Sequence, residues 1–100
     1  MTDKKNRDQL LKRAISTYGE QAQCDMMIEE SSELIKAMMK LRRACSDEDK
    51  RKAIADLKGE MADVQIMLDQ MRIIFGDTDA TEAEKLERLA GRLDKHLNEG

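Results

Sequence analysis

The stretch "MIEESSELIKAMMKLRRAC", residues 27–45, decides the expected fold because its apolar positions follow one helical seam. These positions recur at alternating spacings of four and three, the pattern of a helix packed in a bundle or coiled coil. The apolar ones are Met27, Leu34, Met38, Leu41 and Cys45, and Ser31 completes the spacing. The stretch therefore predicts a long helix, over about residues 20–44, that buries one face against other helices.

Three further helices are predicted around this one. The first covers residues 3–18, and a third begins after the N-cap Ser46 and continues to residue 75. The letters TEAE, residues 81–84, form a capping box that opens a last helix. The last helix carries one apolar stripe, made of Leu86, Leu89, Leu93 and Leu97. The whole chain is predicted to be all-α.

Composition agrees with solvated helices and excludes several functions. Charged residues make up 39% and proline is absent, which favours long helices over a sheet. Residues 1–100 are expected to form a single domain with a modest core, so we predict a four-helix-bundle-type subunit that assembles into a helical dimer or a dimer of dimers. The net charge of −3 argues against a nucleic acid polymer as partner. The sequence shows neither a membrane-length apolar run nor a signal-peptide core, which predicts a cytoplasmic protein without a membrane partner.

Three glutamates crowd the start of the second helix, and helical geometry separates their roles. At about 100° per residue, Glu30 lies only ~40° from Leu34 and falls inside the apolar arc. Glu29 falls on the polar face, where the interpretation is a solvated surface acid. Glu33 lies at the border between the two faces.

The third helix repeats the arrangement, with Glu60 at the edge of its apolar stripe and Asp63 one step further round. A helical surface acid normally has a cation three or four residues away, yet Glu30, Glu60 and Asp63 have none. Such acids need compensation from elsewhere, either from lysine or arginine on a neighbouring helix or from a divalent cation. Carboxylates on two adjacent antiparallel helices suit Mg²⁺, with Mn²⁺ as the alternative.

Glu30-x-x-Glu33 and, after a spacer of twenty-six residues, Glu60-x-x-Asp63 resemble the ExxE…ExxD signature of the MazG-like, all-α nucleoside triphosphate pyrophosphatases. The segments YGEQAQ, EESSEL, EMADVQIMLDQM and EKLERLAGRL extend the similarity over about residues 18–93. The resemblance implies a homodimer or homotetramer that uses Mg²⁺ to hydrolyse an acid anhydride, converting a (deoxy)nucleoside triphosphate into monophosphate and pyrophosphate. It also implies that these four acids are the metal ligands and the catalytic residues, and Glu33 or Glu30 is expected to orient the attacking water.

Basic and amide side chains are the candidates for substrate binding. Cations line one face of the last helix, opposite the leucines, and three of them are predicted to reach phosphates: Lys85, Arg88 and Arg92. The alternative is a solvated face paired with neighbouring glutamates. Lys58 lies one turn from the acids of the third helix and is a further candidate. Gln23 shares a helix face with Glu30, where its amide meets a base edge or merely solvates a helix end.

Two classes of function remain open at this point. The first is a Mg²⁺-dependent nucleotide pyrophosphohydrolase, with a dUTP- or dCTP-specific hydrolase as a variant within the same class. The second is a non-catalytic helical oligomer, an interaction module whose acids are satisfied by ion pairs between helices. Dependence on a divalent metal separates the two classes.

Overall fold

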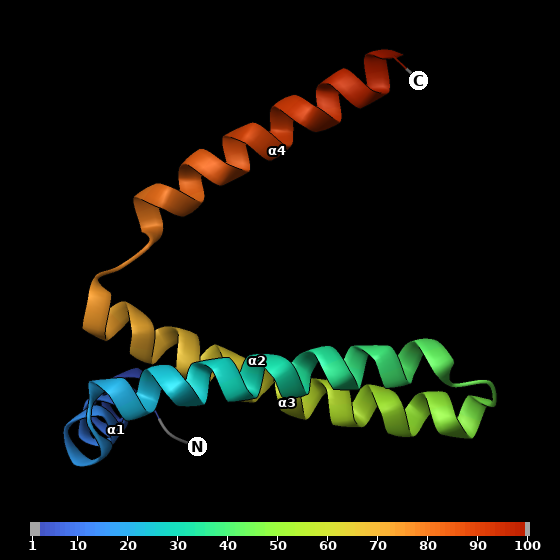
Figure 1. Cartoon of the computed structure of the whole chain (residues 1–100). Helices are drawn as coiled ribbons and strands as arrows, with labels where there is room; N and C mark the ends of the chain where they lie inside the picture. The colour runs from blue at the N-terminus through green and yellow to red at the C-terminus, as the bar shows by residue number, and fades with distance from the viewer. Residues whose placement is uncertain (1–2, 100) are drawn as a thin grey trace.

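The computed structural model describes residues 3–99, which form four helices and no strand (Figure 1). The helices are α1 (Lys4–Tyr18), α2 (Glu20–Arg43), α3 (Asp47–Phe75) and α4 (Asp79–Glu99). The prediction of an all-α chain is confirmed. Over the described residues, none of the helices combines the length and the apolar character that a membrane crossing requires.

Glycine and serine fix the ends of the first three helices. Gly19 is the single residue between α1 and α2, and its φ of +97° lies in the left-handed region that side-chain-bearing residues avoid. Ser46 caps α3, since its hydroxyl accepts a hydrogen bond from the Asp49 amide at 3.0 Å. Gly76 ends α3 with a φ of +109°. The predicted cap at Ser46 is confirmed, as are the predicted ends of the first and third helices at residues 18 and 75.

The predicted start of the last helix is wrong by three residues, because a capping box at Thr81 places the first helical residue at Glu82. Helix α4 begins at Asp79, so Thr81 lies inside the first turn rather than at the N-cap. The side chain of Asp77 accepts a hydrogen bond from the Asp79 amide at 3.2 Å, and the Thr78 carbonyl accepts one from the Glu82 amide at 2.8 Å. An earlier group of capping residues therefore initiates the helix before the TEAE box is reached.

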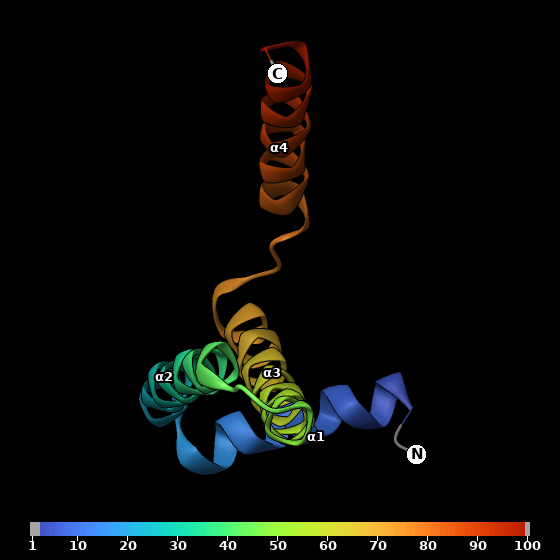
Figure 2. The ribbon, with the colours of Figure 1, turned by 90° about the vertical axis from the view of Figure 1, so that its right-hand side faces the viewer.

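Helices α2 and α3 pack side by side as an antiparallel pair, and α1 crosses one end of that pair (Figures 1 and 2). The core between them is thin, because no side chain of the described residues is more than 98% buried. Its buried apolar residues are Leu11, Ala37, Ala53, Leu57, Val64 and Met67. Met38, a member of the predicted seam of α2, remains exposed, as do Met61 and Phe75 of α3.

Helix α4 extends away from the other three helices and packs against none of them within residues 3–99 (Figures 1 and 2). Its four stripe leucines are 43–75% exposed. The radius of gyration is 17.5 Å, against about 13 Å for a compact domain of this length. The predicted four-helix bundle therefore does not form within one chain, because α3 ends at Gly76 and α4 leaves the α2–α3 pair there.

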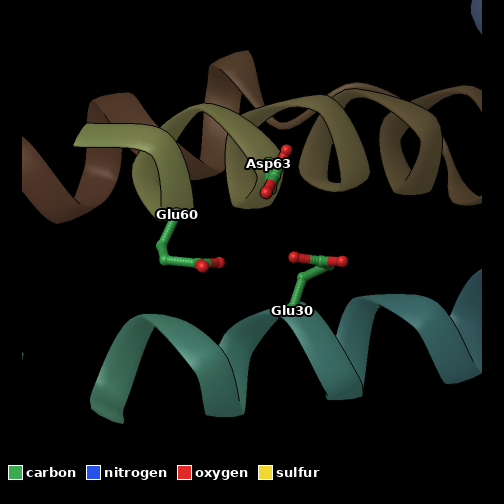
Figure 3. A group of neighbouring side chains, drawn as sticks. All are labelled: Glu30, Glu60 and Asp63. Carbon is green, nitrogen blue, oxygen red and sulfur yellow. The ribbon is translucent and has the colours of Figure 1, made fainter. Parts of the chain in front are cut away.

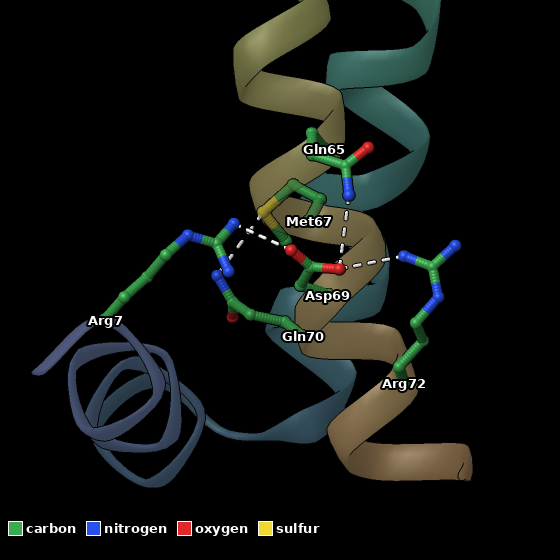
Figure 4. A network of polar contacts seen from close by, with 6 residues as sticks. All are labelled: Arg7, Gln65, Met67, Asp69, Gln70 and Arg72. Atoms are coloured by element: carbon green, nitrogen blue, oxygen red, sulfur yellow. Dashed lines mark hydrogen bonds and ion pairs between the residues drawn. The ribbon is translucent and has the colours of Figure 1, made fainter. Parts of the chain in front are cut away.

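A polar network joins α1 to α3 (Figure 4). The guanidinium of Arg7 donates to the Asp69 carboxylate at 2.7 Å, and Arg72 donates to the same carboxylate at 2.9 Å. Gln65 adds a third donor at 3.2 Å, and Arg72 also binds the Thr78 hydroxyl. Burial alone would raise the pKa of Asp69, but the hydrogen bonds from Arg7, Gln65 and Arg72 hold that pKa below its ordinary value. The ionised carboxylate of Asp69 thus links α1 to the antiparallel α2–α3 pair, called the hairpin below.

Candidate metal centre

Three of the four signature acids meet in the space between α2 and α3 (Figure 3). Glu30 reaches across from α2, while Glu60 and Asp63 come from successive turns of α3. Each offers one carboxylate oxygen, and these three oxygens all lie within 4.8 Å of one another. Glu30 and Glu60 are half-buried, whereas Asp63 is exposed. Three hard oxygen ligands at this separation fit a divalent cation such as Mg²⁺ or Mn²⁺, with water or phosphate oxygens completing the coordination.

The register of the antiparallel pair explains why these acids meet. Gln23 precedes Glu30 by seven residues, and Gln70 follows Asp63 by seven. The buried amides of Gln23 and Gln70 are hydrogen-bonded at 2.7 Å, and Glu30 meets Asp63 two turns further along. A shift of either helix by one residue would separate both pairs, because it rotates each side chain by about 100°. The amide pair therefore holds the register in which the acids converge.

The site is electrostatically uncompensated. Partial burial raises the pKa of Glu30, and the negative charges of Asp63 and Glu60, with those of Glu29 and Glu33, raise it further. Among residues 3–99, no lysine or arginine nitrogen lies within 4.0 Å of the carboxylates of Glu30, Glu60 or Asp63. The alternative of ion pairs between helices is thus not observed for these acids. A bound divalent cation would remove the repulsion.

Glu33, the fourth signature acid, lies beside the cluster rather than in it. Its carboxylate accepts a hydrogen bond from the Lys36 ammonium at 3.4 Å. It lines the same shallow groove between α2 and α3 as Glu60 and Asp63. Glu29 is exposed on the outer face of α2, which confirms its interpretation as a solvated acid.

The groove that begins at these acids has a volume of about 420 Å³, and two lysines line it, Lys36 and Lys40. The sequence prediction missed both lysines, since they share the polar face of α2 with Glu29. A signal was present, because they follow Glu33 by three and seven residues and therefore lie on the Glu33 side of the helix.

The residues predicted to bind substrate are scattered in the single chain. Lys85, Arg88 and Arg92 belong to α4, which packs against no other described helix, so the structure does not bring them to the acids. Lys58 is exposed on α3 and is not part of the groove lining. Gln23 is 6% exposed, and its amide nitrogen is engaged by Gln70.

Comparison of the chain with protein-family models, with curated proteins and with solved structures finds no match in any of the three. What the centre can do follows from its own ligand set. Carboxylates alone repel a polyanion, while carboxylates holding Mg²⁺ or Mn²⁺ attract one and polarise it. The centre is therefore suited to bind a phosphate chain through a metal ion.

Proposed function

We propose that this protein is a Mg²⁺-dependent nucleoside triphosphate pyrophosphohydrolase of the MazG-like kind, with Mn²⁺ as a substitute metal. The observation that carries the proposal is the meeting of Glu30, Glu60 and Asp63 across two helices without a neighbouring cation. These acids are three of the four in the ExxE…ExxD signature. Two of the three acids, Glu30 and Glu60, are half-buried rather than fully solvated, and a divalent cation would offset the repulsion among them.

In the proposed reaction, Glu30, Glu60 and Asp63 hold the metal. When bound, the metal neutralises part of the triphosphate charge, polarises the α-phosphate and lowers the pKa of a coordinated water. Glu33 lies outside the three-acid cluster and lines the groove, so we assign it to orient the attacking water and accept its proton. The water oxygen bonds to the α-phosphorus, the bond from that phosphorus to the bridging oxygen breaks, and pyrophosphate leaves with the electron pair.

We further propose that the working form is a homodimer or homotetramer in the cytoplasm. The leucines of α4 have no partner helix in the described part of the chain, and α3 leaves Ile66, Ile73 and Phe75 39–74% exposed. A second copy supplies apolar surface of the same kind in a closed, symmetric assembly. In such an assembly, the cations of α4 reach a phosphate only across a subunit boundary.

Phosphorus NMR tests the reaction. The full chain is incubated with a panel of ribo- and deoxynucleoside triphosphates, first with Mg²⁺ and then with EDTA. We expect monophosphate and pyrophosphate with Mg²⁺, no product with EDTA, no turnover by Glu60→Gln and near-wild-type turnover by Glu29→Gln. Turnover of dUTP or dCTP alone would define a specialised hydrolase. Diphosphate with free phosphate would contradict the proposal, because it means attack at the γ-phosphorus.

A second candidate is a non-catalytic helical oligomer that serves as an interaction module. The exposed leucine stripe of α4 favours it, since this helix has an apolar face and packs against no other helix within residues 3–99. Absence of product with every nucleotide, from a protein that still oligomerises, would select the module over the enzyme.

A further inference from the structure

The groove at the acids continues toward the α2–α3 connection at residues 44–46. A second hollow, with a volume of about 490 Å³, lies between the last turns of α2 and the first turns of α3. The two hollows share Lys40 and Asp56 in their linings, so they adjoin one another, and together they are called the groove below. One end of this groove lies at the candidate metal centre, and the other lies at the tip of the hairpin.

The charge of the lining changes sign along the groove. The part next to the metal centre presents four carboxylates and two lysines, whereas the far part presents three cations and two carboxylates. The far cations are Lys40, Arg43 and Lys52. Of these, Lys52 pairs with the exposed Glu48 at 3.5 Å, while no described carboxylate lies within 4.0 Å of Lys40 or Arg43. An anion entering from the metal centre therefore meets unpaired cations further along.

The spacing on α2 suits a linear phosphate chain. A helix rises about 1.5 Å per residue, which places Lys36 about 4.5 Å and Lys40 about 10.5 Å beyond Glu33 along the axis. Lysine carries its charge on a flexible four-carbon stem, so both ammonium groups can bend back toward the groove floor. Lys36 is already held by Glu33 at 3.4 Å, which leaves Lys40 as the first cation without a partner.

We propose that this groove is the subsite for the terminal phosphates of the substrate, with Lys40 as the main contact and Lys36 as the second. The inference rests on the proposed function, because a metal-held α-phosphate fixes one end of the chain. It assigns a direction to the substrate. The leaving pyrophosphate points toward residues 44–46, and the nucleoside points back along α2 toward its N-terminal end.

A purely structural role for these cations is also testable. Lys40, Arg42 and Arg43 all lie in the last turn of α2, where positive charge complements the negative end of the helix dipole. Arg42 shares that position but lines neither part of the groove. Arg42→Ala is therefore the matched control for Lys40→Ala, since both remove one exposed positive charge from the same turn and both introduce a better helix former.

Titration calorimetry with inorganic tripolyphosphate tests the subsite on the full chain in the presence of Mg²⁺. We expect Lys40→Ala to weaken binding about tenfold, the loss typical of one charge-assisted hydrogen bond. Lys36→Ala should weaken binding less, because wild-type Lys36 must first leave Glu33. Arg42→Ala should remain within about twofold of wild type, since removing a screened exposed charge changes little. Far-ultraviolet circular dichroism confirms that each variant is folded.

The outcomes separate the subsite from the proposed function. If binding requires Mg²⁺ and is lost in Glu60→Gln, but Lys40→Ala and Arg42→Ala weaken it equally, the subsite is overturned and the metal centre stands. If the affinity for tripolyphosphate is the same with EDTA and in Glu60→Gln, the metal centre is contradicted. The subsite is then contradicted as well, because it depends on the metal. Failure of wild type to bind tripolyphosphate with Mg²⁺ also overturns the subsite, while phosphorus NMR decides the function independently.

Discussion

The carboxylates of Glu30 and Asp63 face one another across the α2–α3 pair, with oxygens within 4.8 Å and no described cation in ion-pair range. Like charges this close, one of them half-buried, oppose folding unless a cation joins them. Burial and the neighbouring charges of Asp63 and Glu60 both raise the pKa of Glu30, so the ionised form of Glu30 is less stable in the folded protein than in water. Binding of the proposed cation would therefore stabilise the α2–α3 pair.

Neutralising one of these acids should stabilise the metal-free protein. In EDTA, we expect Asp63→Asn to raise the free energy of unfolding by about 0.5 kcal/mol, the size of one like-charge pair. This corresponds to a melting temperature higher by about 2–4 °C. Thermal unfolding followed by circular dichroism measures the change, and Glu29→Gln, on the outer face, should change it less. A lower melting temperature for Asp63→Asn would mean that this carboxylate has a stabilising partner.

With a divalent metal, wild type should become more stable than Asp63→Asn, the reverse of the order expected in EDTA. A ligand at ten times its dissociation constant stabilises the native state by about 1.4 kcal/mol, so Mg²⁺ or Mn²⁺ should raise the melting temperature of wild type by several degrees. Glu30→Gln, Glu60→Gln and Asp63→Asn should each lose most of that rise. Glu29→Gln should keep it, because its side chain is exposed away from the centre. Equal metal responses in all four variants would place the metal elsewhere.

The parts of the site that follow from helical periodicity were predictable. The angular position of Glu30 and the absence of local cations around Glu60 and Asp63 indicated a shared site before any tertiary information. Features set by tertiary contacts were not predictable. The i,i+3 and i,i+4 pattern does not say which neighbour a helix chooses, so it could not show that α4 leaves the hairpin. It also assigned the Gln23 amide either to a base edge or to a helix end, whereas the register of α2 on α3 buries that amide against Gln70.

The amide pair of Gln23 and Gln70 should behave as a coupled structural unit. Gln23→Leu leaves the buried Gln70 amide oxygen without its donor, so we expect a loss of about 1–3 kcal/mol in the free energy of unfolding. Replacing both glutamines by leucine removes both polar groups and should recover most of that loss. Chemical denaturation of the two single variants and the double variant gives the coupling energy.

The same variant tests whether Gln23 contacts a nucleobase. A structural role predicts that Gln23→Leu lowers stability and leaves nucleotide preference unchanged. A raised KM for one nucleotide, with unfolding free energies that add without coupling in the double variant, would contradict the structural role and restore base recognition.

The network around Asp69 should make folding sensitive to acid. The folded-state pKa of Asp69 lies below its ordinary value of 3.8, so its contribution to stability is complete above that value. The contribution is lost as the pH falls below about 4 and through the folded-state pKa. With the Asp69 side chain 25% exposed, we expect Asp69→Asn to cost about 1 kcal/mol at neutral pH. The same variant should lose less stability than wild type on acidification.

Urea denaturation at a series of pH values from neutral to about pH 3 measures this difference. Glu48→Gln is the matched control, because it breaks an exposed pair with Lys52 at 3.5 Å and should cost less than about 0.5 kcal/mol at any pH. If the free energy of unfolding falls equally with acidification in wild type and in Asp69→Asn, the acid sensitivity belongs to other carboxylates.

Helix α4 should control the oligomeric state. Leu89 is 43% exposed and Leu93 is 54% exposed on the apolar stripe of a helix that packs against none of the other described helices. Burying such a side chain in a subunit interface contributes about 1.5–3 kcal/mol. We therefore expect the double change Leu89→Ser with Leu93→Ser to shift a wild-type dimer or tetramer toward monomer at micromolar concentration. Size-exclusion chromatography with light scattering measures the mass.

The matched control changes the polar side of the same helix, with Glu87→Ser and Lys95→Ser together. Both side chains are exposed and their charges cancel, so the control carries a similar helix-propensity penalty without touching the leucines. It should keep the wild-type mass. If the leucine variant also keeps that mass, the apolar stripe of α4 does not hold the assembly. The exposed residues of α3, Ile66 and Ile73, would then be the next surface to change.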